Sequence, residues 1–421
     1  MLHINKIRDN KEAYITLLKV KNMDATELFN AVISLDDERK STQQKADEFL
    51  AKGNQLAIQI GELYKTGKSQ EANALKEESS RIKEESKVLQ HKQAELEKDI
   101  QNILVQIPNI PHSSVHAGKS DTDNITIKES AKIPTLMAGA KPHWELTSKY
   151  SLIDFELGNK ISGAGFPVYT NKGARLQRAL ITYFLDKNIA AGYTEYLPPH
   201  LVNAASGFGT GQLPDKEGQM YHVAEDDLYL IPTAEVPVTN FFRDVIVNDF
   251  PIKCTAYTPC FRREAGSYGK DVRGLNRLHQ FDKVEIVQIQ HPEKSYETLD
   301  AMINHVASIL DELELPYRIL QLCGGDLSFT SSLTFDFEVY SAGQEKWLEV
   351  SSVSNFESYQ ANRLKLRYKD ENGKTQLCHT LNGSALALPR IYAALIENNQ
   401  TPDGVKIPKA LQPYTGFDII K

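Results

Sequence analysis

The sequence predicts an α+β protein, in which an antiparallel β-sheet is flanked by helices and preceded by an antiparallel two-helix coiled coil. In the first hundred residues, apolar side chains recur every seven positions, which is typical of a coiled coil. In the second half of the chain, strand-like runs follow one another as hairpins, which build an antiparallel sheet rather than a doubly wound parallel one. No GxGxxG follows a predicted strand, so dinucleotide binding is disfavoured.

Composition indicates an ordinary globular protein. The net charge of −7 argues against a broadly basic nucleic-acid coat, although a local RNA-binding patch remains compatible with it, and no DNA partner is expected. The charged N-terminus and the lack of long apolar runs predict a cytoplasmic protein with no membrane partner. The four cysteines lack metal-binding spacing, so we expect reduced thiols and no zinc: Cys254, Cys260, Cys323 and Cys378.

Two heptad repeats define the predicted arm. The first runs from about Ala25 to Leu63, with Thr42 as its one polar interruption, through Leu28, Leu35, Phe49, Leu56 and Leu63. The second contains Leu75, Ile82, Leu89, Leu96 and Ile103. The short joint at residues 65–68 requires antiparallel helices. The string GELYKTGKS at this joint resembles a phosphate-binding P-loop, but its glycine spacing is wrong and no strand precedes it, so we interpret it as a turn.

A segment rich in Pro, Ser, Gly and Asp, residues 107–124, predicts a domain boundary. We therefore expect an N-terminal domain at residues 1–106 and a second domain at 107–421. Soon after the boundary, Ala174 to Ala191 has an amphipathic helical pattern and leads into the strand-like YTEYLPPHLV. The helix places four apolar side chains on one side: Leu176, Leu180, Tyr183 and Phe184.

Two predicted strands, roughly Thr255 to Ala265 and Phe281 to Ile289, are joined by a long charged loop. Strand alternation predicts that Arg262 and Glu264 share one face, with Arg263 on the other, and that Phe281, Lys283 and Glu285 lie together. An arginine can clamp a phosphate, a ring can stack on a purine and a carboxylate can hold an amine. These residues suit a nucleotide beside an amino acid; the alternative is an exposed hairpin with surface ion pairs.

Further hairpins follow. One is predicted around residues 341–344 between Leu327 and Phe356, and another at Asn372-Gly373. Residues three apart on a regular strand face opposite ways, so Glu349 and Ser352 can act together only if the strand has a bulge or ends near residues 350–351. The last motif, from Leu381 to Gln400, predicts a strand, a tight turn and a helix with Pro389 at its first position. Arg390 then lies where the helix dipole favours anions.

The run FRREAGSYGKD, followed by RGL and HQFDKVE, resembles motif 2 of class II aminoacyl-tRNA synthetases, specifically of the seryl-tRNA synthetase family. The helix, strand and Pro198 of the preceding region resemble motif 1, which builds the dimer interface in that family. The strand and helix around Arg390 resemble motif 3. The resemblance implies the class II catalytic fold, a homodimer and the N-terminal coiled coil that grips tRNA.

The resemblance implies a two-step reaction, in which ATP activates L-serine as seryl-adenylate and the seryl group passes to tRNA(Ser), with tRNA(Sec) as a further candidate. Arg262 and Arg390 are the implied catalytic residues, on the α- and γ-phosphates. Mg²⁺ would be held with ATP by Glu349 and Ser352. The implied ATP contacts are Arg262, Arg263, Glu264, Phe281, Glu349, Val350, Ser351, Ser352 and Arg390. The implied serine contacts are Thr233, Ala234, Glu235, Arg262, Glu285 and Ser384, and whether Glu285 takes the amine or the hydroxyl stays open.

The coiled coil is the implied tRNA-binding element, and its candidate phosphate contacts are Lys52, Lys65, Lys68, Lys76, Arg81 and Lys83. A salt-bridged, solvated helix face is the alternative for each. The arginine-rich tract expected in the family near the distal end of the first helix reads AKGNQLAIQIG here. Two alternatives remain for the whole chain: a non-catalytic paralogue that binds RNA or protein, and an amino acid:carrier-protein ligase. The set of charged motif residues argues against the first, and the long arm argues against the second.

Overall fold

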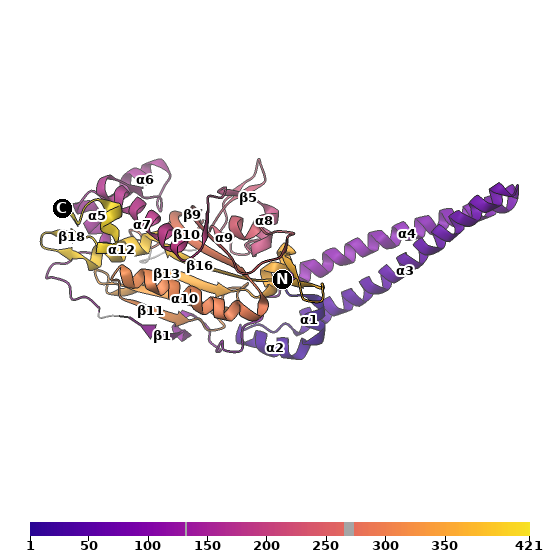
Figure 1. Ribbon diagram of the computed structural model, residues 1–421, viewed down its shortest axis with the longest axis horizontal. Coiled ribbons are helices and arrows are strands. Elements are labelled where there is room, and N and C mark those ends of the chain that lie inside the picture. Colours follow the sequence, from indigo (N-terminus) through magenta and orange to yellow (C-terminus); the bar gives the residue numbers. More distant parts are fainter. Residues whose placement is uncertain (131–132, 265–272) are drawn as a thin grey trace. The chain divides into compact units, whose positions relative to one another are not determined.

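The computed structural model describes residues 1–130, 133–264 and 273–421 (Figure 1). Contacts divide the chain into two compact units. The arm unit comprises residues 2–19 and 23–108, and the sheet unit comprises Met1, residues 20–22 and residues 109–421. Among the described residues, no helix is long and apolar enough to cross a membrane.

The arm unit is a helical hairpin, which confirms the predicted coiled coil. Helices α3 (Thr26–Lys65) and α4 (Ser69–Leu104) pack along their length and are joined by a turn in which Gly67 has φ +77° (Figure 1). The predicted seven-residue positions form the seam, where every such side chain is buried or half-buried. Two short helices that the heptads did not predict, α1 (Ile4–Asp9) and α2 (Lys11–Val20), precede the hairpin.

An eight-stranded sheet organises the other unit, in the order β1-β11-β12-β13-β16-β10-β9-β4. The pairs are antiparallel, as predicted, except that the edge strand β4 runs parallel to β9. In this order the strands are Ile125–Glu129, Tyr317–Gln321, Leu333–Ser341, Lys346–Asn355, His379–Ala387, Gln280–Gln290, Ile252–Phe261 and Thr194–Tyr196.

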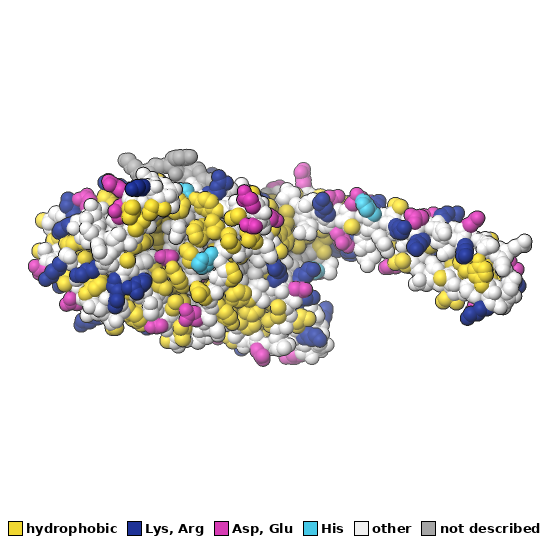
Figure 2. All heavy atoms as spheres, turned by 90° about the horizontal axis from the view of Figure 1, so that it is seen from above, with side chains coloured by type: hydrophobic (Ala, Val, Ile, Leu, Met, Phe, Trp, Pro, Cys, Tyr) yellow, Lys and Arg dark blue, Asp and Glu magenta, His cyan; other side chains and the backbone are white. Residues whose placement is uncertain are grey.

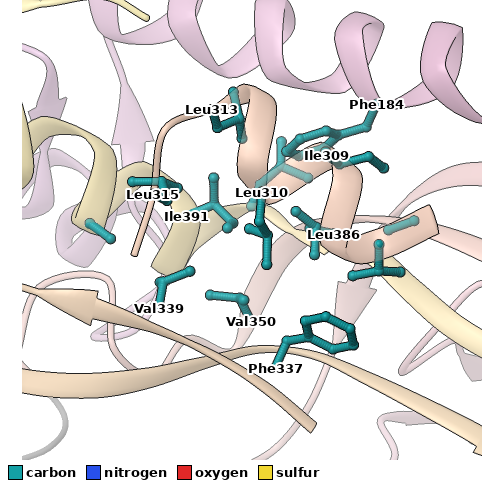
Figure 3. Packing of buried hydrophobic residues seen from close by; sticks show 14 of the residues in the cluster. Phe184, Ile309, Leu310, Leu313, Leu315, Phe337, Val339, Val350, Leu386 and Ile391 are labelled. Atoms are coloured by element: carbon teal, nitrogen blue, oxygen red, sulfur yellow. The ribbon is translucent and has the colours of Figure 1, made fainter. Parts of the chain in front are cut away.

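Helices α7 (Asn171–Ala190), α10 (Ser295–Glu312) and α12 (Leu388–Asn398) bury one face of this sheet in a single hydrophobic cluster. Figure 3 shows Phe337 and Val350 of the sheet beneath Leu310 of α10. The four side chains predicted on the apolar side of α7 are all buried: Leu176, Leu180, Tyr183 and Phe184. With one face covered in this way, polar side chains of the opposite face are available for a site.

The predicted hairpins are confirmed: β12 pairs with β13, and β14 (Arg367–Lys369) pairs with β15 (Thr375–Leu377). The second hairpin joins β8 (Ile246–Val247) in a separate small sheet. The remaining α-helices and strands are α5 His143–Lys149, β2 Ile153–Asp154, α6 Phe155–Ile161, β3 Val168–Tyr169, β5 Leu201–Asn203, α8 Ala204–Thr210, β6 His222–Val223, β7 Leu228–Leu230, α9 Glu235–Asn240, α11 Ser358–Leu364, β17 Gln400–Thr401, β18 Gly404–Lys406, α13 Gln412–Thr415 and β19 Ile419–Ile420.

One strand boundary differs from the prediction. Strand β9 ends at Phe261 instead of continuing to Ala265, and Glu264 has φ +49°. A positive φ is incompatible with an extended strand, so the alternation argument that placed Arg262 and Glu264 on one strand face is wrong. The remainder of the predicted loop, residues 265–272, lies outside the described residues. At the third motif, β16 leads directly into α12, and Pro389 is the second helical residue instead of the first.

Candidate active site

The carboxylate of Glu285 is the centre of a buried polar cluster on the face of the sheet opposite the helices. Strand β10 keeps continuous register with β9, so Phe281, Lys283 and Glu285 point to the same side, as predicted. The Glu285 carboxylate lies 2.5 Å from Lys283 Nζ and accepts a hydrogen bond of 3.3 Å from Thr233 Oγ1. Ser384 Oγ lies 3.5 Å from the same oxygen. Three of the predicted serine contacts therefore meet at one carboxylate.

A second carboxylate borders this cluster. Glu235 begins α9, its backbone N–H donates to Thr233 Oγ1 at 3.2 Å, and its side chain accepts a 2.6 Å bond from Gln360 Nε2. Burial raises the pKa of Glu235 to about 7, and the charge of Glu285 acts in the same direction. Two carboxylates around the single ammonium of Lys283 leave a site that attracts a further cation, such as the amine of an amino acid. Ala234, the residue before α9, is buried in an apolar cluster.

Sequence reasoning missed Gln360. This α11 residue is almost fully buried, donates to Glu235, and accepts a 2.7 Å bond from Thr380 Oγ1. It therefore holds the Glu235 carboxylate in place. Its partner lies 125 positions away in the chain, so no local periodicity signals the contact.

The predicted nucleotide clamp lies where β9 ends. The guanidinium carbon of Arg262 lies 5.2 Å from the centroid of the Phe281 ring, a cation–π distance. The Arg262 backbone N–H donates to the His279 carbonyl at 2.9 Å, which fixes the chain after the strand. Arg263 is exposed, and Glu264 forms a 2.9 Å ion pair with Arg277. The structure thus brings Arg262 and Phe281 together and leaves Glu264 engaged with another side chain.

Strand β13 carries the predicted bulge. Ser351 pairs with Phe337 and Glu349 pairs with Glu338, so Val350 is an extra residue on this strand. The bulge lets Glu349 and Ser352 line one hollow of about 630 Å³. Val350 packs in the hydrophobic core (Figure 3), and the Ser351 hydroxyl donates to the Ser384 carbonyl at 2.5 Å. Only the backbone groups of these two residues are therefore available to a nucleotide.

Arg390, the third residue of α12, connects this strand to the segment after the motif 2 loop. Its Nη1 donates to the Glu349 carbonyl at 2.9 Å and lies 3.7 Å from the Glu349 carboxylate. Its Nε donates to the Asn276 carbonyl at 3.1 Å. The guanidinium is thereby fixed from two sides and remains partly exposed next to Glu349, which lines the hollow.

The hollow offers oxygen ligands for a hard cation. Asp336 lies opposite Ser352 in the β12–β13 pair, and its Oδ1 is buried without a hydrogen-bond partner among the described residues. Burial and the charge of Glu349 hold the pKa of Asp336 well above its usual range. Carboxylate and hydroxyl oxygens fit Mg²⁺, which commonly takes its remaining ligands from phosphates and water. Among the described residues, no three His, Cys, Asp or Glu side chains are grouped so that they could hold a metal ion.

The candidate RNA contacts are all exposed on the arm: Lys52, Lys65, Lys68, Lys76, Arg81 and Lys83. Acidic residues intersperse with basic ones along its surface (Figure 2). Lys52 pairs with Glu78 at 2.8 Å, and Lys76 Nζ lies 5.2 Å from the Tyr64 ring centroid. Lys68 and Arg81 pair with Glu71 and Glu85. An RNA would have to compete for these exposed pairs, which are weak in water.

Comparisons with known proteins agree on one family. Residues 1–111 match the model of the seryl-tRNA synthetase N-terminal domain, and residues 221–399 match that of the tRNA synthetase class II core domain (G, H, P, S and T). The serine--tRNA ligase of Salinibacter ruber is 48% identical over 99% of this chain and 98% of its own length. That of Akkermansia muciniphila is 46% identical over 100% of this chain and 99% of its own length.

Solved structures lead to the same family. The seryl-tRNA synthetase from Pyrococcus horikoshii, complexed with ATP, has a TM-score of 0.91 and 34% identity over 100% of this chain and 99% of that chain. The cytoplasmic serine-tRNA ligase of Naegleria fowleri, in complex with AMP, has a TM-score of 0.86 and 27% identity over 100% of this chain and 99% of that chain. Sequence and fold agree over the full length, and the chain therefore belongs to the seryl-tRNA synthetase family of class II aminoacyl-tRNA synthetases.

Proposed function

We propose that this protein is an ATP-dependent serine--tRNA ligase. In the first step, a carboxylate oxygen of L-serine attacks the α-phosphorus of ATP, and pyrophosphate leaves. In the second, the 2′- or 3′-hydroxyl of the terminal tRNA adenosine attacks the seryl carbonyl carbon, and AMP leaves. The observation that carries the proposal is that Thr233 and Ser384 converge on Glu285, on the same face of β10 as Phe281, whose ring contacts Arg262.

The amino-acid pocket selects a small polar guest. Glu235 and Glu285 attract its ammonium, and the hydroxyls of Thr233 and Ser384 lie within hydrogen-bonding reach of the same centre. A site built to bond a hydroxyl can reject an analogue without one by about 10⁴–10⁵-fold, which excludes alanine. Threonine is excluded because the pocket lacks room for its methyl group. If that methyl behaves like one methylene, the pocket discriminates against threonine by about 10–200-fold.

The nucleotide lies between Phe281 and Arg390 in this proposal. Phe281 stacks on the adenine, and Arg262 bridges the α-phosphate and the attacking carboxylate, where it offsets the charge that grows in the transition state. Arg390 binds the γ-phosphate. Glu264 reaches the adenine amine once it releases Arg277, while Arg263 and the backbone at Val350 and Ser351 supply outer contacts. Phosphoryl-type transfer depends chiefly on such positioning and charge.

We infer that Mg²⁺ binds with ATP at the β13 bulge. Glu349 and Ser352 would hold it, with the unpartnered oxygen of Asp336 nearby. When bound, the ion neutralises phosphate charge. Glu349 also fixes Arg390 through its backbone carbonyl, so one residue would support both the ion and the arginine.

We infer that the two-helix arm binds tRNA(Ser), and that tRNA(Sec) is a second candidate. The proposed division is an arm at residues 1–106 and a catalytic domain at 107–421. A-form RNA is recognised largely through its shape and phosphates, which suits exposed lysines on a rigid helical pair.

Because the substrate tRNA works with ribosomes, we place the protein in the cytoplasm. Its four cysteines are buried free thiols, as a reducing compartment allows.

We further infer a homodimer, because the sheet unit exposes an apolar surface near its β4 edge. Exposed hydrophobic residues from the motif 1 region and its neighbours are Ile189, Tyr196, Leu197, Leu201 and Phe241. The rings of Tyr196 and Phe241 lie 5.1 Å apart. Figure 2, which looks onto the side carrying α6, α7 and β5, shows hydrophobic side chains gathered there. An exposed apolar patch of this kind is typical of a protein interface.

Serine-dependent exchange between ATP and pyrophosphate, measured across several amino acids, tests the proposal. Serine should support exchange, and a long-variable-arm tRNA should be charged. Arg262→Ala should abolish exchange and leave the fold intact, whereas the matched control Arg367→Ala, which breaks a surface pair with Asp244, should not affect it. No exchange with serine would indicate a non-catalytic paralogue. Exchange without tRNA charging would indicate a carrier-protein ligase.

A further inference from the structure

Glu397, near the end of α12, is a fully buried carboxylate held by five donors. Its Oε1 accepts from the backbone N–H and Nδ1 of His143 at 2.7 Å each, and from Gln344 Nε2 at 3.1 Å. Its Oε2 accepts from the Ser341 hydroxyl and from the Gly343 N–H. So complete a set of donors satisfies the buried charge and fixes the orientation of the His143 ring.

The other ring nitrogen of His143 holds the segment after the motif 2 loop. Its Nε2 accepts a 2.9 Å hydrogen bond from the Leu275 backbone N–H. Nδ1 therefore carries the proton and Nε2 carries the lone pair. The neighbouring Gly274 has φ +66°, and a Cβ there would lie 2.2 Å from His143 Nε2. The backbone thus approaches the imidazole as closely as a glycine allows.

The segment at residues 274–276, which His143 holds, contacts Arg390 directly. Asn276, one residue beyond Leu275, accepts the 3.1 Å bond from Arg390 Nε through its carbonyl. Its side-chain amide donates to Gln344 Oε1 at 2.9 Å, and Gln344 itself donates to Glu397. The two ends of α12 are therefore connected through a separate backbone segment. Glu397 holds that segment through His143 and Gln344, and the segment holds Arg390.

We propose that His143 is a positioning residue for ATP binding. It sets the backbone of residues 274–276 so that the Asn276 carbonyl holds Arg390 in line with the nucleotide phosphates. The inference rests on the proposed function, because Arg390 is taken to bind those phosphates. His143 itself touches no reacting group, and its effect should appear in ATP binding and leave serine binding unchanged.

Two substitutions at His143 separate its two hydrogen bonds. His143→Asn keeps a donor near the Nδ1 position for Glu397 but offers nothing to the Leu275 N–H. His143→Gln can place its amide oxygen near the Nε2 position and accept from Leu275. We expect His143→Asn to raise KM for ATP about five- to tenfold in pyrophosphate exchange, the effect of losing one hydrogen bond, with KM for serine within twofold. His143→Gln should restore KM for ATP toward the wild-type value.

Matched controls distinguish positioning from stability. His305→Asn removes a 2.7 Å bond to Asn188 elsewhere in the same unit and should lower Tm without changing KM for ATP. Gly274→Ala should raise KM for ATP even if the His143 variants fail to fold. Its control is Gly373→Ala, at a similar φ of +73° but with no atom within 4 Å of the new Cβ, so it adds backbone strain without the imidazole clash.

The outcomes are separable. An unchanged KM for ATP in His143→Asn and Gly274→Ala would overturn the inference, as would equal changes in KM for ATP and for serine. The wild-type protein must show serine-dependent exchange in every series. Its absence would reject the proposed function instead, before the role of His143 is tested.

Discussion

The ammonium of Lys283 lies 2.5 Å from the carboxylate of Glu285, and both side chains are almost fully buried. Glu235 adds a second buried carboxylate, whose pKa is raised by burial and by Glu285. Lys283 therefore compensates one of two acidic groups before any substrate binds. The cluster therefore contains two carboxylates for one ammonium, an excess of negative charge that the proposed serine ammonium would balance.

Removing only one member of this pair should be costly. Lys283→Met leaves Glu285 as an uncompensated buried charge, and breaking such a pair costs about 3–5 kcal/mol. We expect a lower urea midpoint for this variant. The double variant Lys283→Met/Glu285→Gln should recover most of the loss, because both charges are then absent.

A surface pair on the arm provides the control. Lys52→Met breaks the exposed contact with Glu78 and should leave the midpoint unchanged, since solvent screens such pairs. A double variant no more stable than Lys283→Met would show that packing, and not unpaired charge, accounts for the loss.

Serine binding should depend on pH through Glu235. Its pKa is raised to about 7 in the folded protein, so the group is neutral below that pH and charged above it. A neutral carboxyl attracts an ammonium weakly. KM for serine should therefore fall about tenfold between pH 6 and pH 8, as the ionised fraction of one such group rises. Glu235 binds its proton more tightly in the folded state than in the unfolded state, where its pKa is about 4.5. The free energy of unfolding should therefore decline as the pH rises from about 4.5 to about 7.

Gln360→Leu tests this assignment, because the Gln360 amide stabilises the ionised form of Glu235 through a 2.6 Å bond. Its loss should move the midpoint of the KM profile to higher pH. Gln290→Leu removes a similarly buried amide that bonds to Thr298, and should not move the midpoint. A profile that keeps its midpoint in Gln360→Leu would assign the titration to another group.

Features with local periodicity could be predicted from the sequence. Heptads predicted α3 and α4, a 3.6-residue pattern predicted α7, and Asn372-Gly373 predicted the β14–β15 turn. The end of β9 could not be predicted in this way. It ends where its pairing with β10 ends, at Phe261 opposite Gln280, and the turn at Glu264 depends on contacts made after folding.

The same distinction between local patterns and tertiary contacts applies to the residues of the candidate site. Arg262, Glu285 and Arg390 could be predicted as site candidates because they lie in strings that resemble the family motifs. His143 and Gln360 could not, because their partners lie 254 and 125 positions away and are set by the tertiary fold. The sequence pattern itself did not indicate the bulge at Val350. It was predicted only because Glu349 and Ser352 could not act together without one.

Glu349→Gln should increase the Mg²⁺ concentration needed for half-maximal pyrophosphate exchange. The substitution removes the negative charge of one proposed ligand at the hollow but retains the backbone carbonyl that binds Arg390. We expect an increase of about tenfold, with partial rescue by excess Mg²⁺. Glu371→Gln, at the exposed β14–β15 turn, is the matched control. An unchanged Mg²⁺ requirement in Glu349→Gln would place the ion elsewhere.

Shortening the arm should separate the two reaction steps. Deleting residues 45–58 and 75–88 removes two heptads from each helix, keeps the turn at Gly67 and preserves the phase of the seam. The arm loses about 21 Å, together with four candidate contacts: Lys52, Lys76, Arg81 and Lys83. Serine-dependent exchange should be unchanged, because every residue of the proposed pocket lies in the other unit. Charging of tRNA(Ser) should fall at least a hundredfold, as expected when several phosphate contacts are lost together.

Replacing only those four cations with Gln should lower tRNA(Ser) charging less than the deletion does, and the difference from the wild-type protein should become smaller at high salt. Equal charging by the full-length and shortened proteins would show that the arm does not bind the tRNA.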